Sequence, residues 1–215
     1  MDFAVIGMGR FGSSVVRTLH EMGHHVLAVD KDEDALRRVT DYATHAVQID
    51  ATDPEALRAV GITNFDAVIV SIGADVQESI LTTLLLKEMG VKKVVSKAVN
   101  ELQARVLGKV GADLVVRPER DMAVRVARSL ASRNVVDLLE LSPAYLVEEV
   151  SVGPKLSGRS LSDLDLRTRF GVNVLLIKRD SQLLITPTPE TELHEGDVLV
   201  VVGEKQGLAR LESVL

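Results

Sequence analysis

Short apolar runs alternate with amphipathic stretches along the first 117 residues of the chain. The runs are rich in Val, Ile, Leu and Ala, which is typical of strands buried on both faces of a parallel sheet. They predict strands near residues 2 to 6, 25 to 30, 46 to 49, 66 to 71, 93 to 96 and 112 to 116. Because the stretches between them have helical periodicity, the pattern predicts an α/β fold with a doubly wound, parallel, Rossmann-like sheet.

Residues 118 to 142 follow this series as a connector. Apolar positions from Met122 to Leu141 are interspersed with arginines, which predicts a helical crossover. This apolar content exceeds what one packed face needs, so we expect the helix to contact a second copy of the chain. Burial of the helix within its own chain is the alternative interpretation.

The pattern changes after residue 142 to short strands separated by Gly, Pro and Asp turns. Strands are expected over residues 145 to 152, 173 to 178, 182 to 185 and 197 to 202. Leu161, Leu164 and Leu166 indicate a short helix between the first two. The sequence thus predicts a nucleotide-binding domain over 1–117, a helical connector over 118–142 and a smaller α+β domain over 143–215.

The first predicted strand leads directly into a glycine-rich G-x-G-x-x-G loop over residues 7–12. In such a loop Gly7 permits the tight turn, Gly9 lets the backbone approach phosphate, and Gly12 lets the next helix pack closely on the sheet. Asp30 ends the second strand, where a carboxylate can hold ribose hydroxyls. Strand, glycines, helix, second strand and terminal acid, in this order, predict a nucleotide site.

Polar and small residues also follow the later strands, at the edge where open α/β sheets bind ligands. They are Asp50, Ala51, Thr52, Ser71, Gly73 and Lys97. Asp50 could receive an adenine amino group, or it could be a turn or cap residue ahead of the next helix. Gly73 permits close backbone approach, and Lys97 is either a ligand contact or a solvated lysine.

Two charged residues indicate which kind of nucleotide the site would bind. Arg10 lies inside the phosphate loop, where its guanidinium favours a ligand with extra negative charge, on its own subunit or a neighbour's. A solvated arginine early in a helix is the alternative. Glu119 follows Pro118 at a helix N-terminus, where the helix dipole alone explains a carboxylate. Beside a polyphosphate, Glu119 could hold Mg²⁺ or Ca²⁺ through oxygen ligation.

Composition narrows the class of protein. Hydrophobic residues make up 46% and charged residues 26%, which suits a globular chain with a sizeable core. The net charge is -6 without a basic run, so we expect no nucleic-acid partner. No stretch reaches the ~18 to 20 apolar residues of a membrane span, and the chain starts with a core strand, so a cytoplasmic protein is expected. The chain has no cysteine, which excludes disulfides and thiolate chemistry within it.

Catalytic groups are not evident in the sequence. None of the five histidines lies in a catalytic motif, and the H-E-x-x-H, G-x-S-x-G and P-loop patterns do not occur. Hydride transfer needs an acid or base held against the cofactor ring. We therefore expect a ligand-gated regulator rather than an enzyme. An NAD-linked oxidoreductase or NADH sensor is the main alternative, because Asp30 suits any unphosphorylated adenosine ribose.

Long blocks of the sequence resemble regulatory subunits of bacterial potassium transporters of the Ktr/Trk type, which are built from RCK (KTN) domains. The blocks cover residues 5–12, 72–83 and 109–122, and residues 195–203 resemble the end of the family's RCK-C domain. Trk-type members usually duplicate the unit within one chain. This chain has one copy, which favours the Ktr type.

The resemblance implies homodimers assembled into an octameric ring that gates an integral-membrane potassium-translocating subunit at the inner face of the cell membrane. It implies ATP or ADP as the ligand, ahead of NADH. The implied nucleotide-binding residues are Gly7, Gly9, Arg10, Phe11, Gly12, Asp30, Asp50, Ala51, Thr52, Ser71, Gly73 and Lys97. Arg10 would reach the terminal phosphate of ATP bound by the neighbouring protomer, and Glu119 would bind a divalent cation at the dimer interface.

The resemblance also concerns the C-terminal domain. In Ktr-type members the RCK-C dimer can bind cyclic di-AMP, and residues similar to that site are Leu166, Arg167, Val172 and Asn173. Arg167 would pair with a phosphate and Asn173 would contact a polar edge of the ligand. Alternatively, Arg167 covers its short helix and Asn173 begins a strand. Gln103 departs from the family, where histidine is frequent. A third hypothesis is a freestanding cyclic di-AMP receptor.

Overall fold

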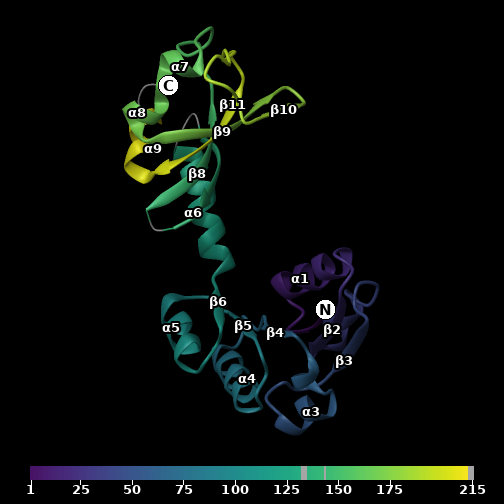
Figure 1. Ribbon diagram of the computed structural model, residues 1–215. Helices are drawn as coiled ribbons and strands as arrows, with labels where there is room; N and C mark the ends of the chain where they lie inside the picture. Colours follow the sequence, from purple (N-terminus) through teal and green to yellow (C-terminus); the bar gives the residue numbers. More distant parts are fainter. Residues whose placement is uncertain (132–134, 143, 213–215) are drawn as a thin grey trace. The chain divides into compact units, whose positions relative to one another are not determined.

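A computed structural model describes residues 1–131, 135–142 and 144–212 of the chain, and Figure 1 traces its helices and strands. The chain divides into two compact units, Met1–Arg120 and Asp121–Leu215. The described residues of the first unit form a six-stranded sheet, and those of the second form a five-stranded sheet.

The first unit is built on a parallel sheet with the order β3-β2-β1-β4-β5-β6. Its strands are β1 Asp2–Ile6, β2 His25–Asp30, β3 His45–Gln48, β4 Ala67–Val70, β5 Val94–Lys97 and β6 Leu114–Val116. From β1 the sheet is extended to β2 and β3 on one side, and from β4 to β5 and β6 on the other. The topological switch point therefore lies between β1 and β4, at the carboxyl ends of these two strands. This confirms the predicted doubly wound fold.

Helices cover both faces of this sheet (Figure 1). They are α1 Arg10–Glu21, α2 Glu33–Arg37, α3 Pro54–Ala59, the 3₁₀ turn η1 Ile62–Asn64, α4 Val76–Glu88 and α5 Glu101–Lys109. Successive residues of β1 point to opposite faces. Val5 belongs to the same buried cluster as Val16 of α1, and Ile6 belongs to the same buried cluster as Leu86 of α4. The sheet therefore lies between two apolar layers, and its carboxyl edge stays available for a site.

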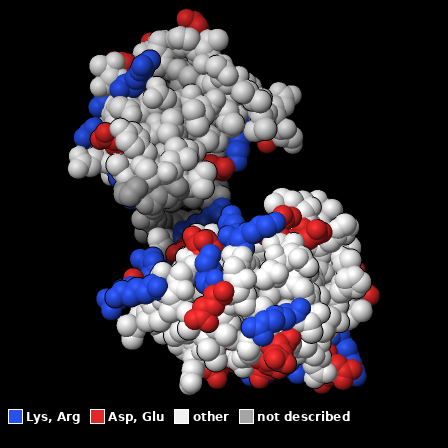
Figure 2. Space-filling view, turned by 60° about the horizontal axis from the view of Figure 1, so that its bottom comes forward, with Lys and Arg blue, Asp and Glu red and all other residues white. Residues whose placement is uncertain are grey.

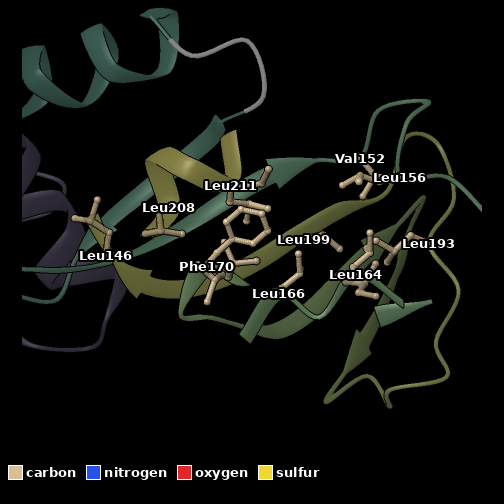
Figure 3. Packing of buried hydrophobic residues seen from close by; sticks show 14 residues of the cluster. Leu146, Val152, Leu156, Leu164, Leu166, Phe170, Leu193, Leu199, Leu208 and Leu211 are labelled. Atoms are coloured by element: carbon tan, nitrogen blue, oxygen red, sulfur yellow. The ribbon is translucent and has the colours of Figure 1, made fainter. Parts of the chain in front are cut away.

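The second unit holds a sheet of order β10-β9-β11-β8-β7, in which all neighbours run antiparallel. Its strands are β7 Val135–Glu140, β8 Tyr145–Ser151, β9 Val172–Arg179, β10 Gln182–Ile185 and β11 Val198–Glu204, and its helices are α7 Leu161–Leu164, α8 Leu166–Phe170 and α9 Lys205–Glu212. Figure 3 shows Phe170 beside Leu208 and Leu211 of α9 in one apolar cluster. The predicted α+β architecture of this part is confirmed.

The segment between the two sheets differs from its prediction. Helix α6 spans Pro118–Ala131, and residues 135–140 form β7, which pairs with β8. The expected helix through residue 141 is therefore wrong over β7, because antiparallel pairing with the next strand of the chain outweighs helical periodicity in an apolar run containing two adjacent valines. Residues 132–134 and 143, also included in the predicted connector and the domain that follows it, lie outside the described residues. No helix in the described part of the chain combines the length and the apolar run required to cross a membrane.

Candidate functional site

The loop between β1 and α1 contains three glycines with different surroundings. Gly7 adopts a φ of +95°, and a side chain there would approach the backbone nitrogen of Ile72 to 3.1 Å. A Cβ at Gly12 would overlap the carbonyl oxygen of Gly7 and lie 2.9 Å from Ser71 Oγ. At Gly9 an added Cβ would meet nothing within 4 Å. The fold thus requires Gly7 and Gly12, whereas Gly9 leaves open space beside the start of α1.

The carboxylate of Asp30 connects the end of β2 to this loop. Its Oδ2 accepts a hydrogen bond from the backbone N–H of Met8 at 2.5 Å, and its Oδ1 accepts one from Asp32 at 2.9 Å. The side chain is thereby fixed at the carboxyl end of its strand. The acid predicted to hold ribose also shapes the phosphate loop.

A cavity of about 240 Å³ lies at the switch point, where the carboxyl ends of the parallel strands meet. It is lined by Ile6, Gly7, Gly9, Asp30, Lys31, Ile49, Ala51, Ser71, Ile72, Gly73, Ala74, Asp75 and Glu78. The structure thus brings six predicted residues together at one cavity, namely Gly7, Gly9, Asp30, Ala51, Ser71 and Gly73. The remaining predicted residues of this site, Arg10, Phe11, Gly12, Asp50, Thr52 and Lys97, are not among its lining.

Ser71 contributes a buried hydroxyl to this cavity. The residue is 5% exposed, and its Oγ has no hydrogen-bond partner among the described residues. Its backbone N–H donates to the Ile6 carbonyl at 2.7 Å, which fixes the residue beside the glycine loop. Buried hydroxyls are rarely left without a partner, and a ligand oxygen at this wall would supply one.

An ion pair that the sequence predictions did not include lines the same cavity. Lys31 Nζ lies 2.7 Å from Glu78 Oε2, and the Glu78 side chain is mostly buried. The hydrogen bond and the charge of Glu78 raise the pKa of Lys31 above its ordinary value. The sequence offered a signal for Lys31, which directly follows Asp30, but none that shows Glu78, in the first turn of the helix after β4, facing the cavity.

A second charged cluster surrounds Lys97, whose Nζ lies 2.7 Å from Glu119 Oε1 at the start of α6. The same nitrogen lies 5.9 Å from the centre of the Phe11 ring. A Cβ placed on Gly73 would come within 3.5 Å of it, so Lys97 reaches the neighbourhood of the cavity. The hydrogen bond from Lys97 holds the pKa of Glu119 below its ordinary value, and the charge of Arg10 lowers it further. Four predicted residues thus lie in one cluster.

Neighbouring side chains alone do not provide enough ligands for the divalent cation predicted at Glu119. Within the described residues, no group of three or more His, Cys, Asp or Glu side chains is arranged to hold a metal ion. Hard cations such as Mg²⁺ need several oxygen ligands, so phosphate oxygens, water or a second copy would have to complete the set. The role of Glu119 stays a prediction.

Asp50 adopts the turn conformation that the sequence offered as the alternative. Its Oδ1 accepts hydrogen bonds from the Thr52 backbone N–H at 2.8 Å and the Thr52 hydroxyl at 2.7 Å. These bonds hold the pKa of Asp50 below its ordinary value. Asp53, rather than Asp50, caps helix α3. Contact of Asp50 with adenine stays a prediction.

A second cavity, of about 340 Å³, lies in the second unit. It is lined by Leu161, Ser162, Asp165, Leu166, Arg167, Val172, Asn173, Val174, Pro187 and Pro189. The four residues predicted for a cyclic dinucleotide are therefore brought together at one place, from α8 and the start of β9. Leu166 and Val172 are buried and also belong to the core, while Arg167 and Asn173 are exposed.

Charge elsewhere on the surface is mixed. Figure 2 shows basic and acidic side chains interspersed over the visible face rather than gathered by sign. Charge therefore acts locally in this protein, at clusters such as those around Lys31 and Lys97.

Comparison with known proteins decides the family. A family model described as the TrkA-N domain matches residues 3–118, and one described as the TrkA-C domain matches residues 147–215. The chain is 45% identical to Ktr system potassium uptake protein C of Bacillus subtilis (strain 168), over 99% of this chain and 96% of that protein. The chain belongs to this family of Ktr potassium uptake proteins. Ktr system potassium uptake protein A of Vibrio alginolyticus is 42% identical, over 99% of this chain and 97% of that protein.

Solved structures agree with the fold of this Ktr family member. The GsuK channel aligns with a TM-score of 0.71 at 19% identity, over 99% of this chain and 39% of the longer channel chain. At that identity the similarity concerns the fold alone. The family resemblance inferred from the sequence blocks is confirmed.

Proposed function

We propose that this Ktr protein is a cytosolic, non-enzymatic regulatory subunit that senses ATP and ADP and gates an integral-membrane potassium-translocating subunit. The observation that carries the proposal is the cavity at the switch point, which Asp30 borders at one end and the Lys97 cluster adjoins beside Gly73. A carboxylate accepts hydrogen bonds from ribose hydroxyls, and ammonium and guanidinium groups bind phosphates. The arrangement suits an adenine nucleotide with its ribose at Asp30 and its phosphates near the Lys97 cluster.

Phosphate binding is supported by the start of α1. Gly9 is the N-cap residue of this helix and has no side chain, so a phosphate can approach the backbone N–H groups at the positive end of the helix dipole. Arg10 follows immediately and is exposed, so it is accessible to a phosphate of its own subunit or of a neighbour. The unpartnered Ser71 hydroxyl offers one more donor at the cavity wall.

The choice of ATP and ADP over NADH rests on the positive charge near the phosphate end. Arg10 and Lys97 both act on Glu119, which places two cations and one carboxylate beside the loop. A terminal phosphate would compete with Glu119 for Lys97, and a divalent cation held by Glu119 would then bridge to phosphate oxygens. This gives ATP and ADP different interactions with the protein, which a ligand needs in order to shift a conformational equilibrium.

Self-association is supported by helix α6. Its exposed apolar side chains include Met122, Val126 and Leu130, with exposed fractions of 54%, 49% and 82%. Such side chains along one helix indicate an interface, and a second copy of the chain is the partner we expect. Homodimers formed in this way would assemble into the octameric ring that contacts the membrane subunit.

The second cavity supports cyclic di-AMP as a further ligand of the C-terminal domain. Arg167 would pair with a phosphate, and Asn173 can both donate and accept hydrogen bonds at the edge of a base. Arg167→Ala is expected to weaken cyclic di-AMP binding at least about tenfold in calorimetric titration. Arg169→Ala is the matched control, because Arg169 stacks on Phe170 outside the cavity lining. Equal affinity of Arg167→Ala and wild type would remove Arg167 from the site.

The central test measures ATP, ADP and NADH affinity of the full chain, followed by potassium flux through the membrane subunit reconstituted in vesicles. Wild type is expected to bind ATP and ADP tighter than NADH and to change flux between them. Arg10→Ala should weaken ATP binding about tenfold. Arg17→Ala, which removes an arginine of the same helix that lies over Tyr42, is the control. Unchanged ATP affinity in Arg10→Ala would refute its role.

An NADH sensor is the second candidate function, favoured by Asp30 alone. The same carboxylate suits the adenosine ribose of NADH. Preference for NADH in the titrations, together with turnover of a small substrate, would replace the regulatory proposal with an oxidoreductase.

A further inference from the structure

The ion pair between Lys31 and Glu78 lines the first cavity beside Asp30. Lys31 follows Asp30 at the end of β2, and Glu78 lies in the first turn of α4, so the pair joins two elements that bound the cavity. The distance between Nζ and Oε2 is 2.7 Å. The Lys31 side chain is 62% exposed and that of Glu78 only 13%. The lysine therefore reaches from solvent to a carboxylate at the cavity wall.

Hydrogen bonds from neighbouring residues hold both partners. The Lys31 carbonyl accepts a hydrogen bond from Gln48 Nε2 at 2.9 Å, which ties the end of β2 to β3. The Glu78 backbone N–H donates to Asp75 Oδ1 at 3.0 Å, which caps α4. The backbones of the two residues are thus held by the fold at positions from which their side chains meet.

The charged residues that line the cavity carry a net negative charge. Asp30, Asp75 and Glu78 are three carboxylates in the lining, and Lys31 is the one ammonium among the lining residues. Carboxylates accept hydrogen bonds from hydroxyl groups, so they favour a ribose with free hydroxyls. A phosphate on the ribose would face like charges at short range, which costs binding free energy.

We infer that Glu78 is a specificity-determining residue that restricts the cavity to adenine nucleotides with an unphosphorylated ribose 2′ position. The inference rests on the proposed function, since it takes the ribose to lie at Asp30. A lysine directly after the ribose-binding acid is otherwise well placed to attract a 2′-phosphate. Glu78 pairs with the Lys31 ammonium and adds its own negative charge. The cavity therefore rejects a 2′-phosphorylated ribose, which Lys31 without this partner would attract.

The test compares AMP with adenosine 2′,5′-bisphosphate, two probes that differ only in the 2′-phosphate, by calorimetric titration of the full chain. Wild type is expected to bind AMP at least about tenfold tighter. Glu78→Gln keeps the size of the side chain and releases Lys31, so this preference should fall about tenfold. Lys31→Gln, a change at a largely exposed side chain, should increase the preference. Glu33→Gln breaks the exposed pair with Arg37 outside the cavity and should leave it within about twofold.

The outcomes separate this inference from the function on which it rests. Parallel titrations with ADP report on the proposed function. If ADP binds to wild type but Glu78→Gln leaves the preference for AMP unchanged, the role of Glu78 is overturned alone. Equal affinity of wild type for the two probes overturns it as well. If wild type binds no adenine nucleotide, both proposals fail.

Discussion

A side chain at Gly12 would overlap the carbonyl oxygen of Gly7, because α1 begins directly against the turn that leaves β1. This contact allows the first turn of the helix, with its unpaired N–H groups, to lie next to the cavity. Gly9 lies between the two glycines and has open space beside it. The three glycines therefore differ in what they do, and substitutions can separate folding from binding.

Gly12→Ala is expected to destabilise the first unit by about 3 kcal/mol, because the methyl group forces α1 away from the loop. Gly9→Ala should lower the free energy of unfolding by about 1 kcal/mol at most, since its φ of -70° suits alanine and only the poorer N-cap of α1 counts against it. Its methyl group would fill the space that a phosphate needs, so ADP affinity should fall at least about tenfold. Urea unfolding and ADP titration of both variants measure these effects.

The opposite pattern would contradict this interpretation of the loop. A Gly9→Ala variant that binds ADP as wild type does would show that no phosphate approaches the Gly9 backbone. A Gly12→Ala variant as stable as wild type would show that the helix can move away from the loop at little cost.

The Lys97–Glu119 pair predicts how divalent cations affect nucleotide binding. Glu119→Gln removes the charge that holds Lys97, so metal-free ATP should bind about threefold tighter. The gain in ATP affinity that Mg²⁺ gives to wild type should disappear, because an amide is a poorer ligand than a carboxylate. Titrations with and without Mg²⁺ measure both effects, and Glu101→Gln, which removes the exposed partner of Arg117, is the control. An undiminished Mg²⁺ effect in Glu119→Gln would exclude Glu119 as a metal ligand.

The sequence predicts the first sheet well because each of its strands is a short apolar run bounded by turn or cap residues. All six predicted strands occur, with ends within two residues of expectation. Strand β7 was missed because its apolar positions also fit helical periodicity, although it pairs with β8, the next strand of the chain. Helix α9 was missed as well, because Gly207 lies in its first half. That glycine is there because a Cβ would overlap the carbonyl oxygen of Phe170, a contact visible only in the folded unit.

The candidate site was predictable where a residue type has a fixed place in the fold. Gly7, Gly9 and Asp30 follow from the order of strand, loop and acid, and the structure brings them to one cavity. Glu78 could not be identified in this way, because its contact with Lys31 joins residues that are 47 positions apart. A helical position alone does not tell which side chain will face a cavity.

Gln103 connects helices α4 and α5 within the first unit. It is 2% exposed, its Oε1 accepts a hydrogen bond from the Val99 backbone N–H at 2.9 Å, and its Nε2 donates to Ser79 Oγ at 3.2 Å. Gln103→Leu removes both hydrogen bonds, leaves the buried Ser79 hydroxyl without its Gln103 partner and should cost about 2 kcal/mol. Gln103→His should cost less, because an imidazole can donate and accept.

Amide hydrogen exchange of α4 and α5 measures this effect residue by residue. Gln103→Leu should accelerate exchange in both helices. The control Gln77→Leu changes an exposed glutamine of α4 and should leave exchange unaltered. Exchange accelerated in α5 only would show that the bond to Ser79 does not couple the helices.

A partly buried ion pair joins Arg179 and Asp197 in the second unit, and we expect the stability of this unit to depend on the pair. Arg179 Nε lies 2.8 Å from Oδ1 and Nη2 lies 2.7 Å from Oδ2, and the Asp197 side chain is 1% exposed. The hydrogen bonds from Arg179 lower the pKa of Asp197, and that from the His194 backbone N–H lowers it further. Asp197→Asn leaves the guanidinium without its charge partner and should cost about 3 kcal/mol at neutral pH.

The lowered pKa gives this contribution a definite dependence on pH. The carboxylate stabilises the folded unit in full above the pKa of an unfolded aspartate, about 3.9, and the contribution is lost as pH falls through the lower pKa of the folded state. The difference in unfolding free energy between wild type and Asp197→Asn should therefore be constant from about pH 7 to pH 5 and shrink below about pH 4. Urea unfolding across this range measures it, with Glu190→Gln as an exposed control. A difference that stays the same down to pH 3 would mean that Asp197 contributes through packing and not through its charge.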